Sequence, residues 1–362
     1  MTLLTLPSTR EEAWRWSDLA ALPALAETQP SGSAGDASGF FLGCGGPRLL
    51  FVDGVYQADS SSPGPVTVGA IDASAGDHPL GRLAEGKGWR LALGRDHAPG
   101  APVEIVHLST GGTNHLAARI DMDDDAQASI IETYAGEGWV NRLTAIRLGR
   151  SARAMRAVRL LGGSGFQSMT ERAELAEGAS LYTSFLGAGG ADSRIDVRSE
   201  LAGEGAFAEI GGALLARGKQ RHDANVVLRH ASPEGMSRQT WRMVAADQAT
   251  ASVAARVEVA RQAQKTDAEQ SLKGLLMERT ATINLKPELE IFADDVKCAH
   301  GATVGELSRD ALFYLSARGV PPLDARALLT RAFIADALDR IGEEQAREAF
   351  KGDADEWLGG AA

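Results

Sequence analysis

Hydrophobic and polar positions divide the chain into three zones. In the first, residues 8–28 place apolar side chains near helical spacing behind a Ser8–Glu11 capping box, and this pattern predicts one helix. Residues 29–39 are rich in Gly, Ser and Ala and predict a linker. Residues 49–56 predict a strand in which Asp53-Gly54 is a hairpin turn signal.

The middle zone is a series of short runs with strand-like alternation, among them residues 194–201 and 225–230. The runs begin roughly 13–15 residues apart, which is wider than a compact sandwich requires. No amphipathic helix of about ten residues or more separates them, so βαβ units are not expected. This pattern favours a β-solenoid in which each rung contacts only its neighbours, and a β-sandwich is the alternative.

The last zone predicts a helical hairpin. Ser308 is a candidate N-cap, and Gly319 is a candidate C-cap that two prolines follow. Asp324 is expected to cap a second helix with a largely apolar face. The segment from Glu343 is polar and acidic, and its Gly-Gly-Ala-Ala end is expected to be mobile.

These zones predict three parts of the chain. Residues 1–100 are expected to form an N-terminal helical region with short strands. Residues 101–304 are expected to form a β-helix core, and residues 305–362 a C-terminal helical region with a polar tail. The expected fold class is therefore mainly β, with helical regions on both sides of the β-helix.

Composition narrows the function. The 362 residues are 44% hydrophobic, so a sizeable core is possible, and the net charge of −11 argues against nucleic acid as a partner. The only cysteines, Cys44 and Cys298, exclude a disulfide scaffold and a self-contained four-cysteine metal site. No run approaches the ~20 apolar residues of a membrane span, and the N-terminus lacks a basic signal-peptide region. A cytoplasmic protein is expected.

The densest chemistry lies in residues 294–305, where the strand zone meets the helical zone. Cys298 and His300 are two positions apart, so in extended chain they project to one side and offer donors suited to soft or borderline metals. Two ligands do not complete a tetrahedral site. The pair therefore indicates either a structural thiol and histidine or half of a metal site that another chain completes.

Other motifs have simpler interpretations. The acidic run 121–125 predicts a solvated turn, with a calcium site or a polysaccharide-enzyme site as alternatives. Residues 43–47 are glycine-rich but lack the Lys-Ser/Thr of a phosphate-binding loop, and Cys44 among them predicts an incidental thiol. A run of arginines predicts a solvent-exposed face of the β-helix, or else a contact surface for an acidic partner. The run comprises Arg142, Arg147, Arg150, Arg153, Arg156 and Arg159.

Residues 266–318 resemble the SufB/SufD family of iron–sulfur cluster assembly proteins. The resemblance is most specific in the Lys-Cys-Ala-His-Gly-Ala-Thr block at 297–303, and it continues through Leu-Phe-Tyr-Leu-Ser-Ala-Arg-Gly at 312–319. Residues 10–19 and 51–54 also resemble N-terminal elements of the family. The Cys-x-His pair is similar to SufD members rather than SufB members.

The resemblance implies a right-handed parallel β-helix that pairs with a SufB-like subunit through its end, or with a second copy of itself when isolated. It further implies a non-catalytic scaffold that binds no cofactor stably alone and holds a transient iron–sulfur cluster at the partner interface. In this scheme His300 acts with a cysteine of the partner, and Cys298 is a neighbouring thiol. A SufC-like ABC-type ATPase is expected to contact the C-terminal helices at Leu312, Phe313, Tyr314, Leu315, Arg318 and Gly319.

Two alternatives remain open at this point. One is a SufB-type subunit that itself carries the cluster. The other is a β-helix carbohydrate-active enzyme, which needs paired carboxylates on one face. Neither nucleic acid nor a membrane is expected as a partner.

Overall fold

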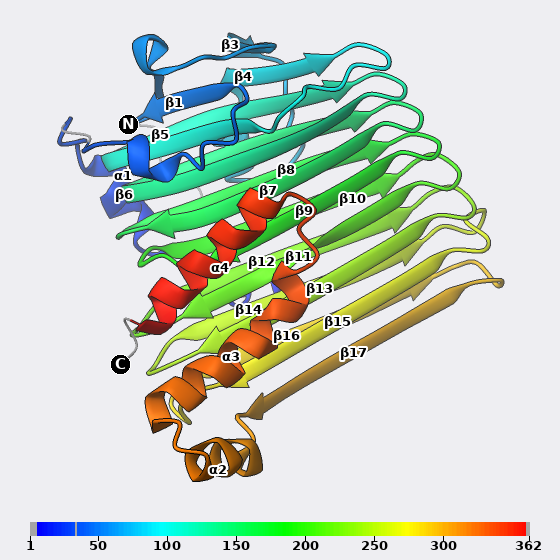
Figure 1. The fold of residues 1–362 in the computed structure, drawn as a ribbon. Coiled ribbons are helices and arrows are strands. Elements are labelled where there is room, and N and C mark those ends of the chain that lie inside the picture. Colours follow the sequence, from blue (N-terminus) through cyan, green and yellow to red (C-terminus); the bar gives the residue numbers. More distant parts are fainter. Residues whose placement is uncertain (1–5, 33–34, 360–362) are drawn as a thin grey trace.

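The computed structural model describes residues 6–32 and 35–359, and a parallel β-helix dominates it (Figure 1). Long strands stack rung upon rung from the N-terminal end to an open C-terminal end. They are β5 (Val103–Met122), β6 (Gln127–Leu148), β7 (Arg153–Gly162), β8 (Phe166–Leu175), β9 (Ser180–Gly187), β10 (Asp192–Leu201), β11 (Phe207–Ala216), β12 (Arg221–His230), β13 (Met236–Ala245), β14 (Thr250–Val259), β15 (Asp267–Leu276), β16 (Thr282–Ile291) and β17 (Lys297–Glu306).

The rungs form two stacked sheets. One sheet runs through β6, β8, β10, β12, β14 and β16, and the other through β6, β7, β9, β11, β13, β15 and β17. All these pairings are parallel, and Ser193 pairs with His222, a full rung later in the chain. Each rung holds two strands, one in each sheet. The spacing between successive strand-like runs in the sequence therefore equals half a rung. The β-solenoid prediction is confirmed, and the sandwich alternative is wrong.

Strand β6 belongs to both sheets because it bends at a glycine. Its first half pairs with β7 and its second half with β8. Gly136 lies at the bend with φ 97°, and a Cβ there would stand 1.9 Å from the carbonyl oxygen of Ser109. Only glycine fits both the positive φ and this close approach of two backbones. Side chains that point between the two sheets form the main apolar core.

The N-terminal segment departs from the prediction of one helix over residues 8–28. It holds a 3₁₀ turn, η1 (Glu12–Trp14), and a short α1 (Leu22–Glu27). The capping-box contact does form, since the Ser8 backbone N–H donates to Glu11 Oε1 at 2.9 Å. The apolar side chains of the segment spread over the β6–β8 sheet and pack on Trp139, so tertiary packing overrides the helical pattern.

Short elements before the β-helix extend its sheets. The Asp53-Gly54 hairpin is confirmed, because β1 (Arg48–Val52) and β2 (Val55–Tyr56) pair antiparallel around it. Strand β1 also adds to β5, and β4 adds to β5 farther along. The remaining elements of this region are η2 (Ser38–Phe40), η3 (Ala58–Ser60), β3 (Val66–Ile71), η4 (Gly81–Ala84) and β4 (Gly86–Leu93).

Three C-terminal helices follow β17: α2 (Arg309–Ala317), α3 (Pro322–Leu338) and α4 (Glu344–Gly359). The predicted hairpin is confirmed, since Ser308 accepts a hydrogen bond from the Ala311 N–H and Gly319 has φ 83°. Helix α3 begins at Pro322, so Asp324 lies in its first turn and is not its cap.

The polar segment from Glu343 forms a helix over its described length. Helix α4 lies across the β7–β17 sheet beside α3 (Figure 1) and buries Phe350 and Trp357 against it. Its other faces are charged, which explains why its sequence appears polar throughout. Mobility was expected of the Gly-Gly-Ala-Ala end, of which Gly359 ends α4 and residues 360–362 lie outside the described residues. No described helix is both long and apolar enough to cross a membrane.

The arginine run is only partly exposed. Arg142 and Arg156 point into the lumen and are 4% and 2% exposed, while Arg159 lies beneath α4. Arg147, Arg150 and Arg153 are exposed. The prediction of one solvent face is therefore wrong for half of the run. Arg142 donates to Asn114, Arg156 pairs with buried carboxylates, and Arg159 pairs with α4.

Candidate functional site

Cys298 and His300 lie on β17, the last strand of the β-helix. The register pairs Cys298 with Ala268 and His300 with Gln270, both of which are buried side chains of β15. Register partners in parallel strands point to the same face, so Cys298 and His300 project toward the lumen side of the last rung. In the described part of the chain no further rung covers them, and His300 is exposed while Cys298 is half-buried.

The two side chains differ in environment. Cys298 packs against a small apolar cluster that includes Ala268 and Ala293, and burial raises the pKa of its thiol. The nearby Asp294 and Asp295 are exposed in the turn before β17. Within residues 6–32 and 35–359, no three His, Cys, Asp or Glu side chains gather in a group that could hold a metal ion. The pair can therefore supply at most half of a tetrahedral site.

The open end around this pair is suited to receive another chain. Strands β16 and β17 each have one paired edge, toward β14 and β15, and within residues 6–32 and 35–359 no strand pairs with their other edges. Phe292 is 60% exposed and Val304 is 45% exposed at this end. A free strand edge beside apolar side chains is a template for pairing with further strands.

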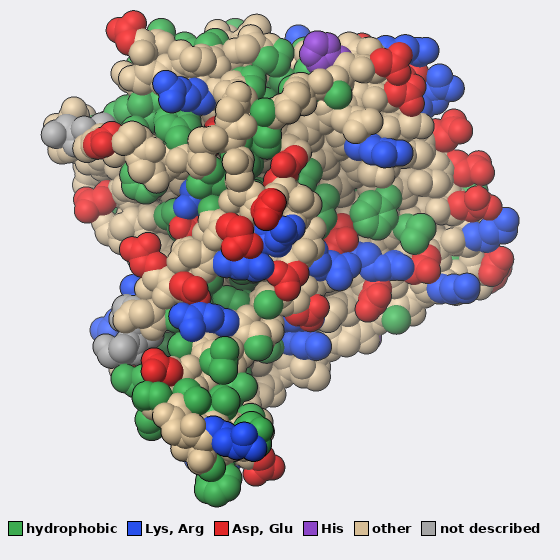
Figure 2. Space-filling model, viewed as in Figure 1, with side chains coloured by type: hydrophobic (Ala, Val, Ile, Leu, Met, Phe, Trp, Pro, Cys, Tyr) green, Lys and Arg blue, Asp and Glu red, His purple; other side chains and the backbone are tan. Residues whose placement is uncertain are grey.

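The predicted ATPase-contact residues form a second surface, at the tip of the helical hairpin. Helix α2 buries none of its residues, and Phe313 and Tyr314 are 76% and 56% exposed. Arg318 stacks over the ring of Tyr314 at 4.9 Å. Figure 2 shows apolar side chains gathered at this lower end of the molecule, over α2 and α3.

Leu312 and Leu315 are half-buried beneath that surface, and Gly319 ends the helix. The structure adds two residues that the sequence interpretation missed, Leu323 and Leu328 of α3, which are 61% and 48% exposed. Their signal was the apolar character of α3, which was interpreted as a face packed on other elements. We call Phe313, Tyr314, Leu323 and Leu328 the hairpin patch.

Helix α3 connects the hairpin patch to the β-helix. Asp336 of α3 pairs with Arg242 of β13, whose Nη1 also donates to the Ser271 carbonyl oxygen of β15 at 2.9 Å. Strand β15 in turn pairs with β17 along its whole length. The helix and the strand that carries His300 are therefore fixed to the same sheet.

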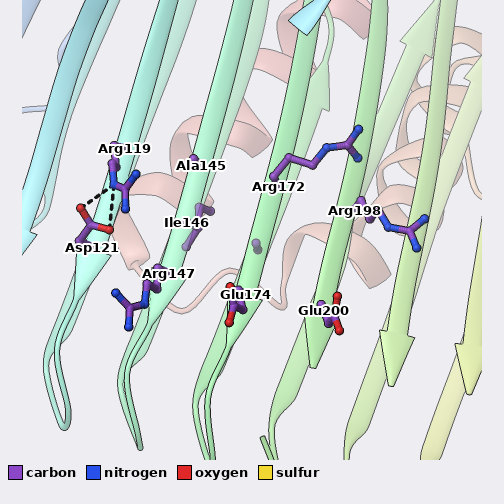
Figure 3. A pocket seen from close by; sticks show the side chains of 10 residues that line it. Arg119, Asp121, Ala145, Ile146, Arg147, Arg172, Glu174, Arg198 and Glu200 are labelled. Atoms are coloured by element: carbon purple, nitrogen blue, oxygen red, sulfur yellow. Dashed lines mark hydrogen bonds and ion pairs between the residues drawn. The ribbon is translucent and has the colours of Figure 1, made fainter. Parts of the chain in front are cut away.

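A charged groove of about 310 Å³ lies on the outer face of the other sheet. Figure 3 shows Arg119 bonded to Asp121 there, with Arg147, Arg172 and Arg198 on the following strands. The register places Glu174 beside Glu200, a carboxylate pair that the sequence interpretation missed because its members are a full rung apart. Arginines alternate with these carboxylates, so the groove is a network of surface charges.

The lumen holds a buried ion cluster near the N-terminal end. Arg156 donates to Glu132 at 2.6 Å and to Glu171 at 2.5 Å, and all three side chains are at most 2% exposed. Tyr134 donates to Glu132, and its ring stacks on His107. Burial lowers the pKa of His107 well below its usual value. This cluster lies many rungs from Cys298, and its charged groups pair with one another.

Comparisons with known proteins place this geometry in context. Residues 107–333 match the family model described as SUF system FeS cluster assembly, SufBD core domain. The iron–sulfur cluster assembly protein SufD of Escherichia coli is 28% identical, over 94% of this chain and 86% of that protein. A SufBD family protein of Synechocystis is 27% identical over 93% and 84% of the two chains. A chloroplastic protein of Arabidopsis thaliana is 39% identical over 36% of this chain and 28% of its own.

Proposed function

Because the chain belongs to the SufB/SufD family of iron–sulfur cluster assembly proteins, and resembles a SufD over most of its length, we propose that it is a scaffold subunit without catalysis of its own. Its cargo is a nascent iron–sulfur cluster, assembled at an interface with a SufB-like subunit. A SufC-like ATPase binds the helical hairpin and drives movement of the two scaffold subunits.

The observation that carries this proposal is the half-site on β17. A thiol and an imidazole project together from an uncapped strand, and thiolate and imidazole are ligands that iron accepts. Since the described chain completes no metal site by itself, a cluster would need ligands from a second chain. Such a shared site can be opened by moving the subunits apart, which suits a protein that passes its cargo on.

The two proposed partner contacts are the surfaces where strand edges or apolar side chains are exposed. The free edges of β16 and β17, with Phe292 between them, are the proposed contact for the SufB-like subunit or for a second copy of this chain. The hairpin patch is the proposed contact for the ATPase, because a protruding apolar patch on a monomer marks an interaction site. The cytoplasmic location expected from the sequence stays a prediction, since one relative is a chloroplastic protein.

The test is anaerobic reconstitution of the chain together with its SufB-like and SufC-like partners, followed by cluster absorbance. His300→Ala is expected to abolish cluster formation while the three proteins still co-purify. His97→Ala is the matched control, because His97 is also exposed but lies far from β17. Full cluster formation by His300→Ala would contradict the shared half-site.

The same experiment separates the SufB-type alternative. A subunit that carries the cluster by itself would develop the absorbance of a cluster when it is reconstituted alone. The proposed scaffold is expected to show that absorbance only with the SufB-like chain present.

A further inference from the structure

A column of polar side chains leads through the lumen to His300. The register of β13, β15 and β17 pairs Gln239 with Gln270, and Gln270 with His300. Neighbouring parallel strands lie roughly 4.8 Å apart and register partners share a face. The three side chains therefore stack one per rung, and His300 is the member at the open mouth.

Gln270 has an unusual environment for an amide. It is 1% exposed, and neither its Oε1 nor its Nε2 has a hydrogen-bond partner anywhere in residues 6–32 or 35–359. The Oε1 of Gln239 is likewise buried without a partner in the same described ranges. Buried polar atoms without partners are costly and uncommon, so each one calls for a physical explanation. The register neighbours of Gln270 on the two adjoining strands are both polar, Gln239 on β13 and His300 on β17.

The direction of this column is set at its inner end. The Nε2 of Gln239 donates to the carbonyl oxygen of Arg256 at 3.1 Å. A carbonyl only accepts, so the amide orientation of Gln239 is settled and its Oε1 is left as an acceptor. Gln270 can satisfy that acceptor only with its own Nε2, which turns its Oε1 toward the next rung. The imidazole of His300 in that rung can then pair with Gln270 only as an N–H donor.

We propose that Gln270 is a positioning residue that accepts a ring N–H of His300 and leaves the opposite ring nitrogen free to bind a soft metal. Histidines that bind metals almost always donate their other N–H to an oxygen, and this contact selects the tautomer and the ring orientation. That the metal is iron of a nascent cluster rests on the proposed function. The positioning itself rests only on the register, the burial and the Arg256 contact.

The tautomer of His300 tests the proposal in the isolated chain. The protein is labelled with ¹⁵N-histidine, the ring signals are assigned with His300→Ala, and two-bond ¹H–¹⁵N spectra report which nitrogen carries the proton. The unsubstituted chain is expected to hold neutral His300 in one tautomer. Gln270→Leu is expected to give the tautomer mixture of a solvent-exposed histidine, and Gln270→Glu, which keeps an oxygen acceptor, to restore the single form. Identical spectra for the unsubstituted chain and Gln270→Leu would overturn the proposal.

Controls separate positioning from folding. Gln270→Leu replaces a partnerless amide by an apolar side chain of similar size, so the thermal midpoint is not expected to fall. Ser199→Ala removes another buried oxygen that lacks a partner in the described chain, on the opposite sheet, and it is expected to leave the His300 tautomer unchanged. A changed tautomer in Ser199→Ala would show that any lumen substitution disturbs His300, and would overturn the assignment to Gln270.

Binding of Co²⁺ alone, followed by its absorbance, gives a second readout. Gln270→Leu is expected to weaken Co²⁺ binding about 10–100-fold, the usual effect of removing such a partner. The effect is expected to vanish in a His300→Ala background, and an equal loss there would overturn a role through His300. If the tautomer is set by Gln270 while His300→Ala still assembles clusters with its partners, the proposed function fails and the positioning role stands.

Discussion

Arg159 of β7 and Asp353 of α4 form a two-point ion pair between residues 194 positions apart. Their atoms meet at 2.7 Å (Nε to Oδ2) and 2.8 Å (Nη2 to Oδ1), and the two side chains are 7% and 11% exposed. Paired donors and acceptors of this geometry are specific as well as strong. This contact fastens the C-terminal helix to the outer face of the β-helix.

Breaking that pair is expected to loosen α4. Arg159→Met leaves the Asp353 carboxylate nearly buried without its partner, and loss of one member of a buried pair costs about 3 kcal/mol of unfolding free energy. Hydrogen exchange should show faster exchange in α4 than in β7. Glu348→Gln, which removes a surface charge of the same helix, is the control and should leave exchange in α4 unchanged. Slow exchange in Arg159→Met would contradict the role of the pair.

The buried ion cluster in the lumen predicts a large loss of stability when Arg156 is replaced. Arg156→Met strands the buried carboxylates of Glu132 and Glu171 and is expected to lower the free energy of unfolding by about 3–5 kcal/mol. Arg153→Met, on the same strand but exposed, is expected to change it by less than about 0.5 kcal/mol. Urea unfolding of the unsubstituted chain, Arg156→Met and Arg153→Met measures both changes in the free energy of unfolding. Equal stabilities for the two variants would show that the cluster contributes nothing.

Buried histidines predict a loss of stability in mild acid. Burial lowers the pKa of His222 and of His230 to about 4 each. Between about pH 6.5 and 4 the unfolded chain binds protons that the folded chain does not. This stability is therefore fully present above pH 6.5 and falls with decreasing pH, by up to about 1.4 kcal/mol per pH unit for each histidine.

The histidine prediction is checked by urea unfolding at several pH values between 4.5 and 7.5. His222→Gln is expected to show a shallower dependence, by the equivalent of about one proton. Comparing the variant with the unsubstituted chain isolates this histidine from carboxylates that titrate nearby. Parallel curves for the two proteins would mean that folding does not lower the pKa of His222.

Phe313 and Phe292 are exposed at different surfaces, so replacing each one is expected to weaken binding of a different partner. Phe313→Ala in the hairpin patch is expected to weaken ATPase binding by about 30-fold or more, as truncation of an aromatic interface residue does. Phe292→Ala, at the open end, is expected to weaken binding of the SufB-like subunit and leave ATPase binding unchanged. Both side chains are more than half exposed, so neither variant is expected to unfold the chain.

Isothermal titration calorimetry of each purified partner with each variant measures these affinities. A Phe313→Ala chain that binds the ATPase with full affinity would remove the hairpin patch from the proposed interface. Loss of both partners by one variant would indicate a general change of structure instead of a local contact.

Local rules in the sequence accounted for much of this protein. The spacing of the strand-like runs predicted the solenoid, since each run is half a rung. The caps at Ser308 and Gly319 and the Asp53-Gly54 turn act through neighbouring residues, so they formed as expected. The two-residue spacing of Cys298 and His300 places both on one side of any strand.

Tertiary structure decided what the register brings together. Arg156 meets Glu171 only because β7 and β8 face each other across the lumen from opposite sheets. His300 stands over Gln270 only because β15 and β17 pair as neighbouring rungs. The single N-terminal helix was wrong because its apolar residues pack across a sheet, which outweighs their helical spacing. Helix α4 was missed because its few apolar residues reach a core only where the β7–β17 sheet lies beneath them. Contacts within and between neighbouring rungs depend on rung length and stacking, which no local pattern contains.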